Sequence, residues 1–405
     1  MSQTGQPEGT PRSQAREYQS GSVLTQTSQT ETEPAVSPLT PPKAAKAKRS
    51  GDFNRNNLDC LRLILASIVC LFHIYALTHI RAFAAYAKYL SAPFAVKAFF
   101  VISGLLIYRS YVKSSSVRSY FEKRVRRIYP AYFTVVVVAA FALFPLSHLS
   151  AAHYFRLGFL KYLVSNLFFL NFLAPTLPGV FRANSEPAVN GALWTLKIEV
   201  AFYLFVPVLH WLSARFGAKK VMVTTFALSC AWKYGFAALA SMGSGPHLFT
   251  LDSSRNLYAQ LDVQLPAQLA YFVAGILLML YFDKLQSYFV VISCVAVGLY
   301  LVDHWFTDGL LDVFWISGLV FVFGFWRYFG NFARFGDFSY GVYIVHFPIL
   351  QTLIALGFAR SNPLGYFSAS LFLVFLAAFL MWHLVEKRFL KSSSHYRQGA
   401  VKAPA

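Results

Sequence analysis

The sequence predicts an all-α fold, a polytopic bundle of about ten transmembrane helices with both termini in the cytoplasm. Of the 405 residues, 56% are hydrophobic, above the roughly 45–50% typical of soluble domains, and the mean hydropathy is +0.48. The apolar residues occur in blocks of roughly 18 to 22, the length that crosses a ~30 Å hydrocarbon core. Lysine and arginine are most frequent in alternate segments between these blocks, which sets the expected orientation.

The N-terminal region differs in composition from the rest of the chain. Residues 1–52 are rich in Ser, Thr, Gln, Pro and Gly, and this composition predicts a disordered cytoplasmic tail. The tail lacks the apolar core of a signal peptide and ends in basic residues. The transmembrane domain is expected over 53–390, followed by a cytoplasmic C-terminal tail, 391–405.

Apolar blocks separated by helix breakers give ten predicted spans. A shorter apolar stretch, 157–173, is expected to be an interfacial or re-entrant helix in an outer loop. The ten spans lie near 58–78, 92–112, 129–147, 192–212, 222–241, 265–282, 287–303, 310–327, 338–357 and 365–386.

Charge counts support this topology. The segments assigned to the inner side carry 22 lysines and arginines, and those assigned to the outer side carry 7. This bias matches the positive-inside rule and predicts that both ends are cytoplasmic. The expected location is the cell inner (plasma) membrane, as a multi-pass protein. The net charge of +19 is therefore read as a topology signal and contact with membrane lipids rather than as nucleic-acid binding. The four cysteines all lie in apolar blocks, without the spacing of a disulfide framework or zinc site, so no metal is expected.

Ionisable residues inside the predicted spans mark candidate functional positions, because a charge at bilayer depth is costly unless it faces the protein interior. Arg62 and His73 lie eleven residues apart in the first span, which places them on one helix face roughly 16 Å apart. The alternative is structural: Arg62 reaches the inner surface and His73 is a hydrogen-bonded core residue. Glu199 lies well inside the fourth span and requires a partner, which Lys197, His73 or Arg62 could supply, either in a structural ion pair or at a site.

Two further patterns indicate binding. Arg124 and Arg127, at i and i+3, would share a helix face and present two guanidinium groups to phosphate oxygens, although positive-inside charge or lipid contact explains them equally simply. His346 precedes Pro348 in the ninth span and would either line a cavity or pack in the core. The Ser103-Gly104 pair indicates close helix packing.

A set of short motifs occurs in a fixed order between about residues 53 and 390. Together these motifs resemble the membrane-bound acyltransferase family 3, whose members include polysaccharide and lipopolysaccharide O-acetyltransferases. The motifs are Leu58–Arg62 with His73, Phe99–Gly104, Lys123–Pro130, Leu193–Glu199, Phe202–Tyr203, Ser339–His346 and Glu386–Lys387.

The resemblance implies that 53–390 is an acyltransferase domain that moves an acetyl group from acetyl-CoA to a hydroxyl of a cell-surface or secreted glycan, or of a lipid-linked saccharide. In that reading His73 is the general base, Arg62 steadies the donor or the developing charge, and Glu199 orients His73 or binds the acceptor. Arg124 and Arg127 bind the CoA phosphates. Trp194, Tyr340 and His346 contact substrate.

Other functions remain open from the sequence. Ten spans with buried ionisable residues also suit a proton-coupled transporter or exporter of a glycan or small metabolite, and a flippase-like partner without chemistry is a third reading. The sequence does not separate direct acyl transfer from a relay through an acylated His73. The acceptor sugar, the acylated position and the oligomeric state are not determined by it.

Overall fold

The computed structural model describes residues 53–242, 257–307, 309–391, 394 and 396. The chain divides into two units, residues 1–49 and 50–405, and every described residue belongs to the second. The predicted N-terminal tail, 1–52, and most of the predicted C-terminal tail, 391–405, therefore lie outside the described residues.

The described part of the chain contains helices and connecting segments but no strand, which confirms the all-α prediction. The helices of ten or more residues are α1 (Leu58–Ala76), α3 (Ala92–Val112), α4 (Val117–Ala142), α6 (Leu157–Leu167), α7 (Trp194–Phe216), α8 (Ala218–Ser241), α10 (Leu265–Leu280), α12 (Phe289–Val302), α13 (Asp312–Phe325), α14 (Phe338–Ala355) and α16 (Pro363–Met381). The shorter ones are α2 (Arg81–Ala87), α5 (Ala151–Tyr154), α9 (Leu257–Asp262), α11 (Phe282–Leu285), α15 (Phe358–Ser361) and α17 (Lys387–Phe389). Two π-helical turns, Asp303–Thr307 and Trp382–Glu386, follow α12 and α16.

Each of the ten predicted spans falls on one of the longer helices. Within the described residues, eight helical stretches are long and apolar enough to cross a membrane, so the chain is a multi-pass membrane protein. Of the other two predicted spans, α13 has only 14 residues and α8 includes the buried Lys233. The count of ten and the side on which each terminus lies remain predictions. The eight stretches are Leu58–Ala76, Arg81–Val112, Val117–Ala142, Gly191–Phe216, Leu257–Leu280, Phe282–Thr307, Phe338–Ala355 and Pro363–Phe389.

The third predicted span, 129–147, has the wrong boundaries. Its helix, α4, begins twelve residues earlier at Val117 and ends at Ala142. The Ser116 hydroxyl accepts a hydrogen bond from Ser119 N and caps the new start. Hydropathy detects only the apolar part of this helix, because the first turns are rich in arginine. Some of these arginines are nevertheless paired with side chains inside the bundle. Arg124 and Arg127, which lie between the second and third predicted spans, are therefore part of α4.

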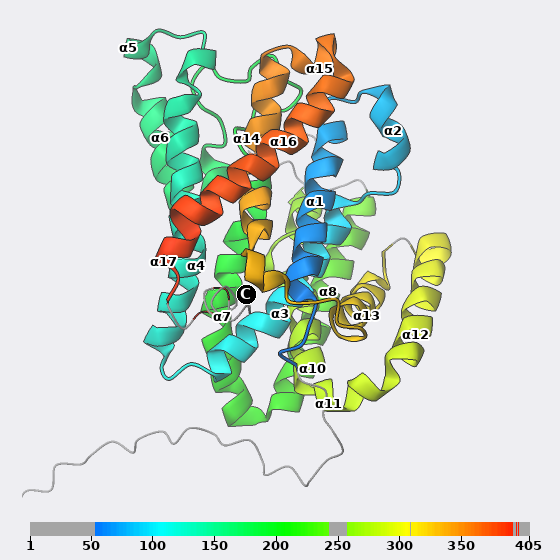
Figure 1. The fold of residues 1–405 in the computed structure, drawn as a ribbon. Coiled ribbons are helices and arrows are strands. Elements are labelled where there is room, and N and C mark those ends of the chain that lie inside the picture. The colour runs from blue at the N-terminus through cyan, green and yellow to red at the C-terminus, as the bar shows by residue number, and fades with distance from the viewer. Residues whose placement is uncertain (1–52, 243–256, 308, 392–393, 395, 397–405) are drawn as a thin grey trace, which may run out of the picture. The chain divides into compact units, whose positions relative to one another are not determined.

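Close backbone approach holds the centre of the bundle together (Figure 1). α1 packs between α3 and α14, and α10 packs against α3 and α8. A Cβ atom added at Gly104 of α3 would lie 1.9 Å from the Phe272 carbonyl oxygen, and one at Gly275 of α10 would lie 2.0 Å from the Val101 carbonyl oxygen. The packing role predicted for Gly104 is confirmed, because any side chain at either glycine would push α3 and α10 apart.

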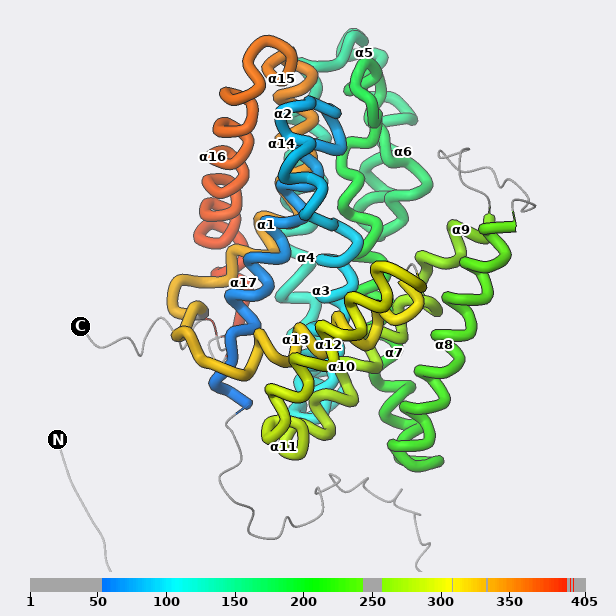
Figure 2. The backbone as a smooth tube through the Cα atoms, turned by 90° about the vertical axis from the view of Figure 1, so that its right-hand side faces the viewer, coloured from blue at the N-terminus to red at the C-terminus, as the bar shows by residue number. Residues whose placement is uncertain are grey.

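The short helices α2, α5 and α15 lie toward one end of the bundle in both Figure 1 and Figure 2. The stretch predicted as a short helix, 157–173, contains α6 and a 3-10 turn, and α6 packs on α4. The first residues of α1 and α14 and the last residues of α16 lie away from that end (Figure 2). Arg62, Asp337 and Glu386 lie at or next to these three helix ends.

Candidate active site

Two arginines and two carboxylates form a buried ionic group, called here the Asp337 cluster, where α1, α4, α14 and the turn after α16 meet. Arg62 Nη1 lies 2.5 Å from Asp337 Oδ2. Arg127 donates to the same Asp337 oxygen and, through Nη1 at 2.9 Å, to Glu386 Oε2. Only 1% of each carboxylate side chain is exposed. Because buried charges are tolerated only when they are paired, these four side chains act as one electrostatic unit.

Asp337 has two structural tasks, one for each carboxylate oxygen. Oδ1 accepts from the Ser339 backbone N–H at 3.1 Å and from the Ser339 hydroxyl, so Asp337 is the N-cap of α14. Oδ2 accepts from both arginines. Burial alone would raise the pKa of the Asp337 carboxyl, but the charges of Arg62 and Arg127 outweigh burial and hold this pKa well below its usual range. The carboxylate is therefore ionised under all ordinary conditions.

Tyr396, from the C-terminal segment, returns to this cluster. Its hydroxyl donates to Asp59 Oδ1 at 2.8 Å and accepts from Arg62 Nη1 at 3.0 Å. The Arg127 guanidinium lies 5.1 Å from the centre of the Tyr396 ring. Burial raises the pKa of the Tyr396 hydroxyl well above its ordinary value, and the nearby carboxylates add to this effect. At least this residue of the predicted C-terminal tail thus packs on the bundle.

A cavity of about 60 Å³ lies beside the Asp337 cluster. Side chains from four helices, α1, α3, α7 and α14, form its wall, so residues that are far apart in the sequence meet there. The lining residues are Arg62, Val96, Phe99, Phe100, Ser103, Thr195, Leu196, Glu199, Ser339, Tyr340 and Tyr343. Three predicted site residues, Arg62, Glu199 and Tyr340, therefore share one cavity.

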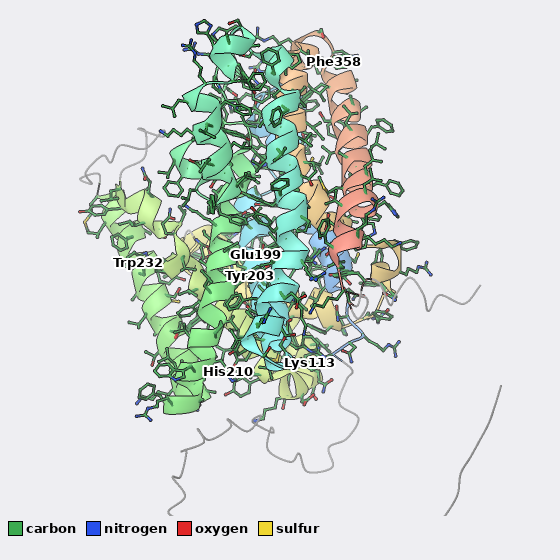
Figure 3. The ribbon with its side chains drawn as sticks, turned by 90° about the vertical axis from the view of Figure 1, so that its left-hand side faces the viewer. Lys113, Glu199, Tyr203, His210, Trp232 and Phe358 are labelled. Atoms are coloured by element: carbon green, nitrogen blue, oxygen red, sulfur yellow. The ribbon has the colours of Figure 1, made fainter. Side chains whose placement is uncertain are left out.

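Glu199 reaches the cavity from α7 and is held by a residue one turn further along that helix. Its Oε1 accepts from the Tyr203 hydroxyl at 2.6 Å. Figure 3 shows Glu199 and Tyr203 in the middle of the bundle, between the levels of Phe358 and His210. The predicted contact of Glu199 with His73 is not among the hydrogen bonds of the described residues, in which Glu199 Oε1 bonds to Tyr203 and His73 Nδ1 lies next to Val69 and His346.

Arg124 and Arg127, the two predicted site arginines of α4, point to different neighbours. Arg124 donates to Ser110 Oγ of α3 at 3.0 Å, and its guanidinium lies 5.8 Å from the centre of the Tyr203 ring. Its buried Nε has no hydrogen-bond partner among the described residues. Arg127, in contrast, already binds two carboxylates. Arg124 is thus the arginine with an unused donor for an anionic ligand.

The two predicted histidines are neighbours. His73 Nδ1 of α1 lies 2.9 Å from the Val69 carbonyl oxygen and 3.2 Å from His346 Nε2 of α14. His346 Nδ1 lies 3.2 Å from the Val342 carbonyl oxygen. The Tyr343 ring, whose residue lines the cavity, is centred 6.0 Å from the His346 ring. The histidine pair therefore adjoins the cavity through Tyr343, but neither histidine is among the residues that line it.

Of the other two predicted substrate contacts, Tyr340 also has a structural role and Trp194 does not line the cavity. The Tyr340 hydroxyl donates to the Ile128 carbonyl oxygen at 3.0 Å, so this side chain also ties α14 to α4. Trp194 is half-buried in the first turn of α7 and is absent from the cavity lining, in which the next two residues, Thr195 and Leu196, take part.

Sequence reasoning did not identify Asp337, Tyr203 or Tyr396. Asp337 had a usable signal, because an aspartate two residues before Ser339 and directly ahead of an apolar block is a helix N-cap pattern. Tyr203 was part of a recognised motif but had no assigned role. Tyr396 had no signal, since only the fold brings it to Arg62. In the part of the chain that the structure describes, no group of three or more His, Cys, Asp and Glu side chains is arranged to hold a metal ion.

Comparison with known proteins gives consistent matches over most of the chain. Residues 55–383 match a family described as an acyltransferase domain. Nodulation protein 10 of Rhizobium leguminosarum bv. viciae is 30% identical over 369 residues, which cover 84% of this chain and 94% of that protein. The O-acetyl transferase of Shigella phage Sf6 is 27% identical over 353 residues, covering 84% of this chain and 97% of that protein. No solved structure matches the chain.

Proposed function

We propose that this chain, which belongs to the acyltransferase family and is a multi-pass membrane O-acyltransferase, moves an acetyl group from acetyl-CoA to a hydroxyl of a cell-surface or secreted glycan. The cell inner membrane is its proposed location. The name of the phage relative supports the acetyl group. The match to an acyltransferase domain over 55–383 favours this enzyme over the proton-coupled exporter that the sequence alone left open.

The observation that carries the proposal is the hydrogen bonding of His73. A backbone carbonyl oxygen only accepts hydrogen bonds, so the Val69 oxygen 2.9 Å from His73 Nδ1 places the ring hydrogen on Nδ1. In the neutral ring Nε2 then carries the lone pair. A half-buried imidazole with an unprotonated Nε2 beside a cavity has the arrangement of a general base.

The proposed reaction is a direct transfer. His73 Nε2 takes the proton from the acceptor hydroxyl as that oxygen attacks the thioester carbonyl carbon. The carbon–sulfur bond then breaks, and the sulfur leaves as a thiolate that takes the proton back from His73. A new oxygen ester and a free thiol result, so His73 ends the cycle neutral. Transfer through an acylated His73 would use the same residue as a nucleophile instead.

Other cavity residues have proposed supporting roles. Arg62 lines the cavity, roughly 16 Å along α1 from His73, and Asp337 fixes its guanidinium, so Arg62 is proposed to steady the acyl donor away from the reacting carbonyl. Glu199 accepts from Tyr203 through one oxygen, and its second oxygen is proposed to accept from acceptor hydroxyls. Arg124, with its unused Nε, is proposed to contact a CoA phosphate. An equivalent contact by Arg127 requires a phosphate to replace one of its two carboxylates.

The test uses cells from which the gene has been deleted and to which wild type or His73→Ala is returned at matched membrane levels. Surface polysaccharide is extracted and its alkali-labile O-acetyl content is measured by proton NMR. We expect acetyl signal with wild type and a loss of at least about 100-fold in initial acetylation rate with His73→Ala, the lower range for removing an acid–base group.

The matched control is His210→Ala, at a histidine of α7 whose ring lies beside Tyr111 rather than at the cavity. We expect it to acetylate at the wild-type rate. Equal acetylation by wild type and His73→Ala would refute the base assignment. Polysaccharide without any added acetyl signal in wild-type cells would refute the proposed glycan acceptor.

A further inference from the structure

We infer that His346 is a positioning residue for the acyl transfer: its Nε2 is a second acceptor, beside the Val69 carbonyl oxygen, for the Nδ1–H of His73, and it fixes the orientation of the His73 ring with Nδ1 toward α14. The inference rests on the proposed function, because it takes His73 as the base. We assign His346 this role in place of the direct substrate contact that the sequence predicted.

When both rings are neutral, their hydrogen-bond partners determine which nitrogen of each histidine carries the ring hydrogen. The Val342 carbonyl oxygen lies 3.2 Å from His346 Nδ1 and only accepts, so the His346 hydrogen is on Nδ1 and His346 Nε2 is an acceptor. The Val69 carbonyl likewise places the His73 hydrogen on Nδ1. The single Nδ1–H of His73 then has two acceptors, the Val69 oxygen at 2.9 Å and His346 Nε2 at 3.2 Å, and is shared between them.

The two rings differ in burial, which indicates that they have different roles. His346 has no exposed surface, whereas His73 is half-buried. The Phe347 ring is centred 5.3 Å from the His73 ring and 6.2 Å from the His346 ring, so an aromatic wall flanks both histidines. His346 is thus enclosed by α1 and α14, and only His73 is placed to meet a substrate.

The contact between the rings has a consequence for the proton transfer. When His73 takes the hydroxyl proton on Nε2, its ring becomes a cation and the Nδ1–H bond to His346 becomes charge-assisted. His346 remains neutral throughout, since it gains and loses no proton. The proton returns from His73 Nε2 to the departing thiolate. His346 therefore stabilises the protonated base without joining the chemistry, as an orienting third group does in other catalytic histidine sites.

The test compares two substitutions of His346 in purified, full-length protein in lipid nanodiscs, with [¹⁴C]acetyl-CoA and deacetylated surface polysaccharide. His346→Leu fills the site but has no acceptor. His346→Gln keeps a side-chain oxygen acceptor. We expect His346→Leu to lower kcat by about 100-fold, the scale of a small misplacement of a catalytic group, with the KM for acetyl-CoA unchanged within about twofold. His346→Gln should recover at least about tenfold of that loss.

Two kinetic outcomes would overturn the inference. Equal kcat values for His346→Leu and His346→Gln would show that the acceptor is irrelevant and that only packing matters. A raised KM with unchanged kcat would make His346 a substrate contact instead. His210→Gln is the matched control and should behave as wild type.

A second measurement does not depend on turnover. In protein labelled with ¹⁵N-histidine, the Nδ1–H signal of His73 is assigned by its disappearance in His73→Gln. We expect this signal to move upfield in His346→Leu and to return toward its wild-type position in His346→Gln. A signal that stays in place in His346→Leu would refute the hydrogen bond. If the bond is present but wild type transfers no acetyl group to polysaccharide, the proposed function fails while the contact between the histidines stands.

Discussion

Two buried groups of charged side chains in this bundle have different designs. In the first, the Asp337 cluster, Arg62 and Arg127 share one carboxylate oxygen next to a cavity. In the second, Asp312 at the start of α13 accepts from Lys97 of α3 at 2.6 Å, from Lys233 of α8 at 2.6 Å and from the Tyr271 hydroxyl of α10 at 2.8 Å. The second group, called here the Asp312 group, ties four helices together.

The two groups differ in whether a cavity adjoins them. Both oxygens of Asp312 have donors from neighbouring helices, and none of Asp312, Lys97 and Lys233 lines the cavity described above. Arg62 of the Asp337 cluster does line it. An ionisable residue inside a span is therefore a packing residue in one group and a candidate site residue in the other.

The largest expected effect comes from breaking the Asp312 group. Asp312→Ala leaves Lys97 and Lys233 without their carboxylate, and we expect the free energy of unfolding to fall by about 3–5 kcal/mol. Thermal unfolding of the detergent-solubilised protein, followed by size-exclusion chromatography of the heated sample, measures this loss. Asp283→Ala, at an exposed aspartate of α11, is the control and should change stability by less than about 0.5 kcal/mol. Equal stability of Asp312→Ala and wild type would remove the structural role.

A smaller effect, on activity alone, is expected at the cavity. Glu199→Gln keeps an oxygen acceptor for the Tyr203 hydroxyl but removes the negative charge. We expect acyl transfer per folded molecule to fall by about tenfold, equivalent to about 1.4 kcal/mol, with the unfolding temperature nearly unchanged. Tyr203→Phe removes the hydrogen bond and keeps the charge, so it should retain more activity than Glu199→Gln. The opposite order would show that the charge of Glu199 is not what the cavity needs.

The smallest expected effect is the pH response of the Asp337 cluster. The pKa of the Asp337 carboxyl is lowered in the folded protein, so its stabilisation is fully present above the unfolded pKa, about 3.9, and is lost as the pH falls toward the folded pKa. The stability difference between Glu386→Gln and the double variant Glu386→Gln/Asp337→Asn, in which the neighbouring Glu386 carboxyl no longer titrates, should therefore be constant from pH 5 to 8 and shrink below about pH 4. Unfolding temperatures of both proteins across this range test the sign. A difference that changes between pH 5 and 8 would contradict the assigned ionisation.

Hydropathy was sufficient to predict the helices but not every helix end. Apolar blocks located all ten predicted spans, because a helix inside lipid must be apolar on its outer face. The start of α4 was missed because Arg124 and Arg127 are polar in sequence yet face the bundle. Hydropathy likewise does not show that Lys97 and Lys233 are paired, because their buried partner Asp312 belongs to a helix that is distant in the sequence.

The candidate site was predicted as residue types but not as contacts. Arg62, His73, Glu199 and His346 were identified because ionisable side chains inside spans are conspicuous. Their pairing depends on how helices pack, and this information is not in the local sequence. Asp337 lies in a connection just before α14, where a carboxylate is unremarkable until two arginines from other helices reach it.

The central claim is that the cavity beside the Asp337 cluster, with His73, is the catalytic site and that the Asp312 group is structural. The most direct test is the rate of acetyl transfer per folded molecule in matched membranes for His73→Gln and Lys97→Met. We predict that His73→Gln is at least about 100-fold slower than wild type and that Lys97→Met, which leaves Asp312 bound to Lys233 and Tyr271, equals wild type. Wild-type transfer by His73→Gln, or loss of transfer in folded Lys97→Met, would contradict it.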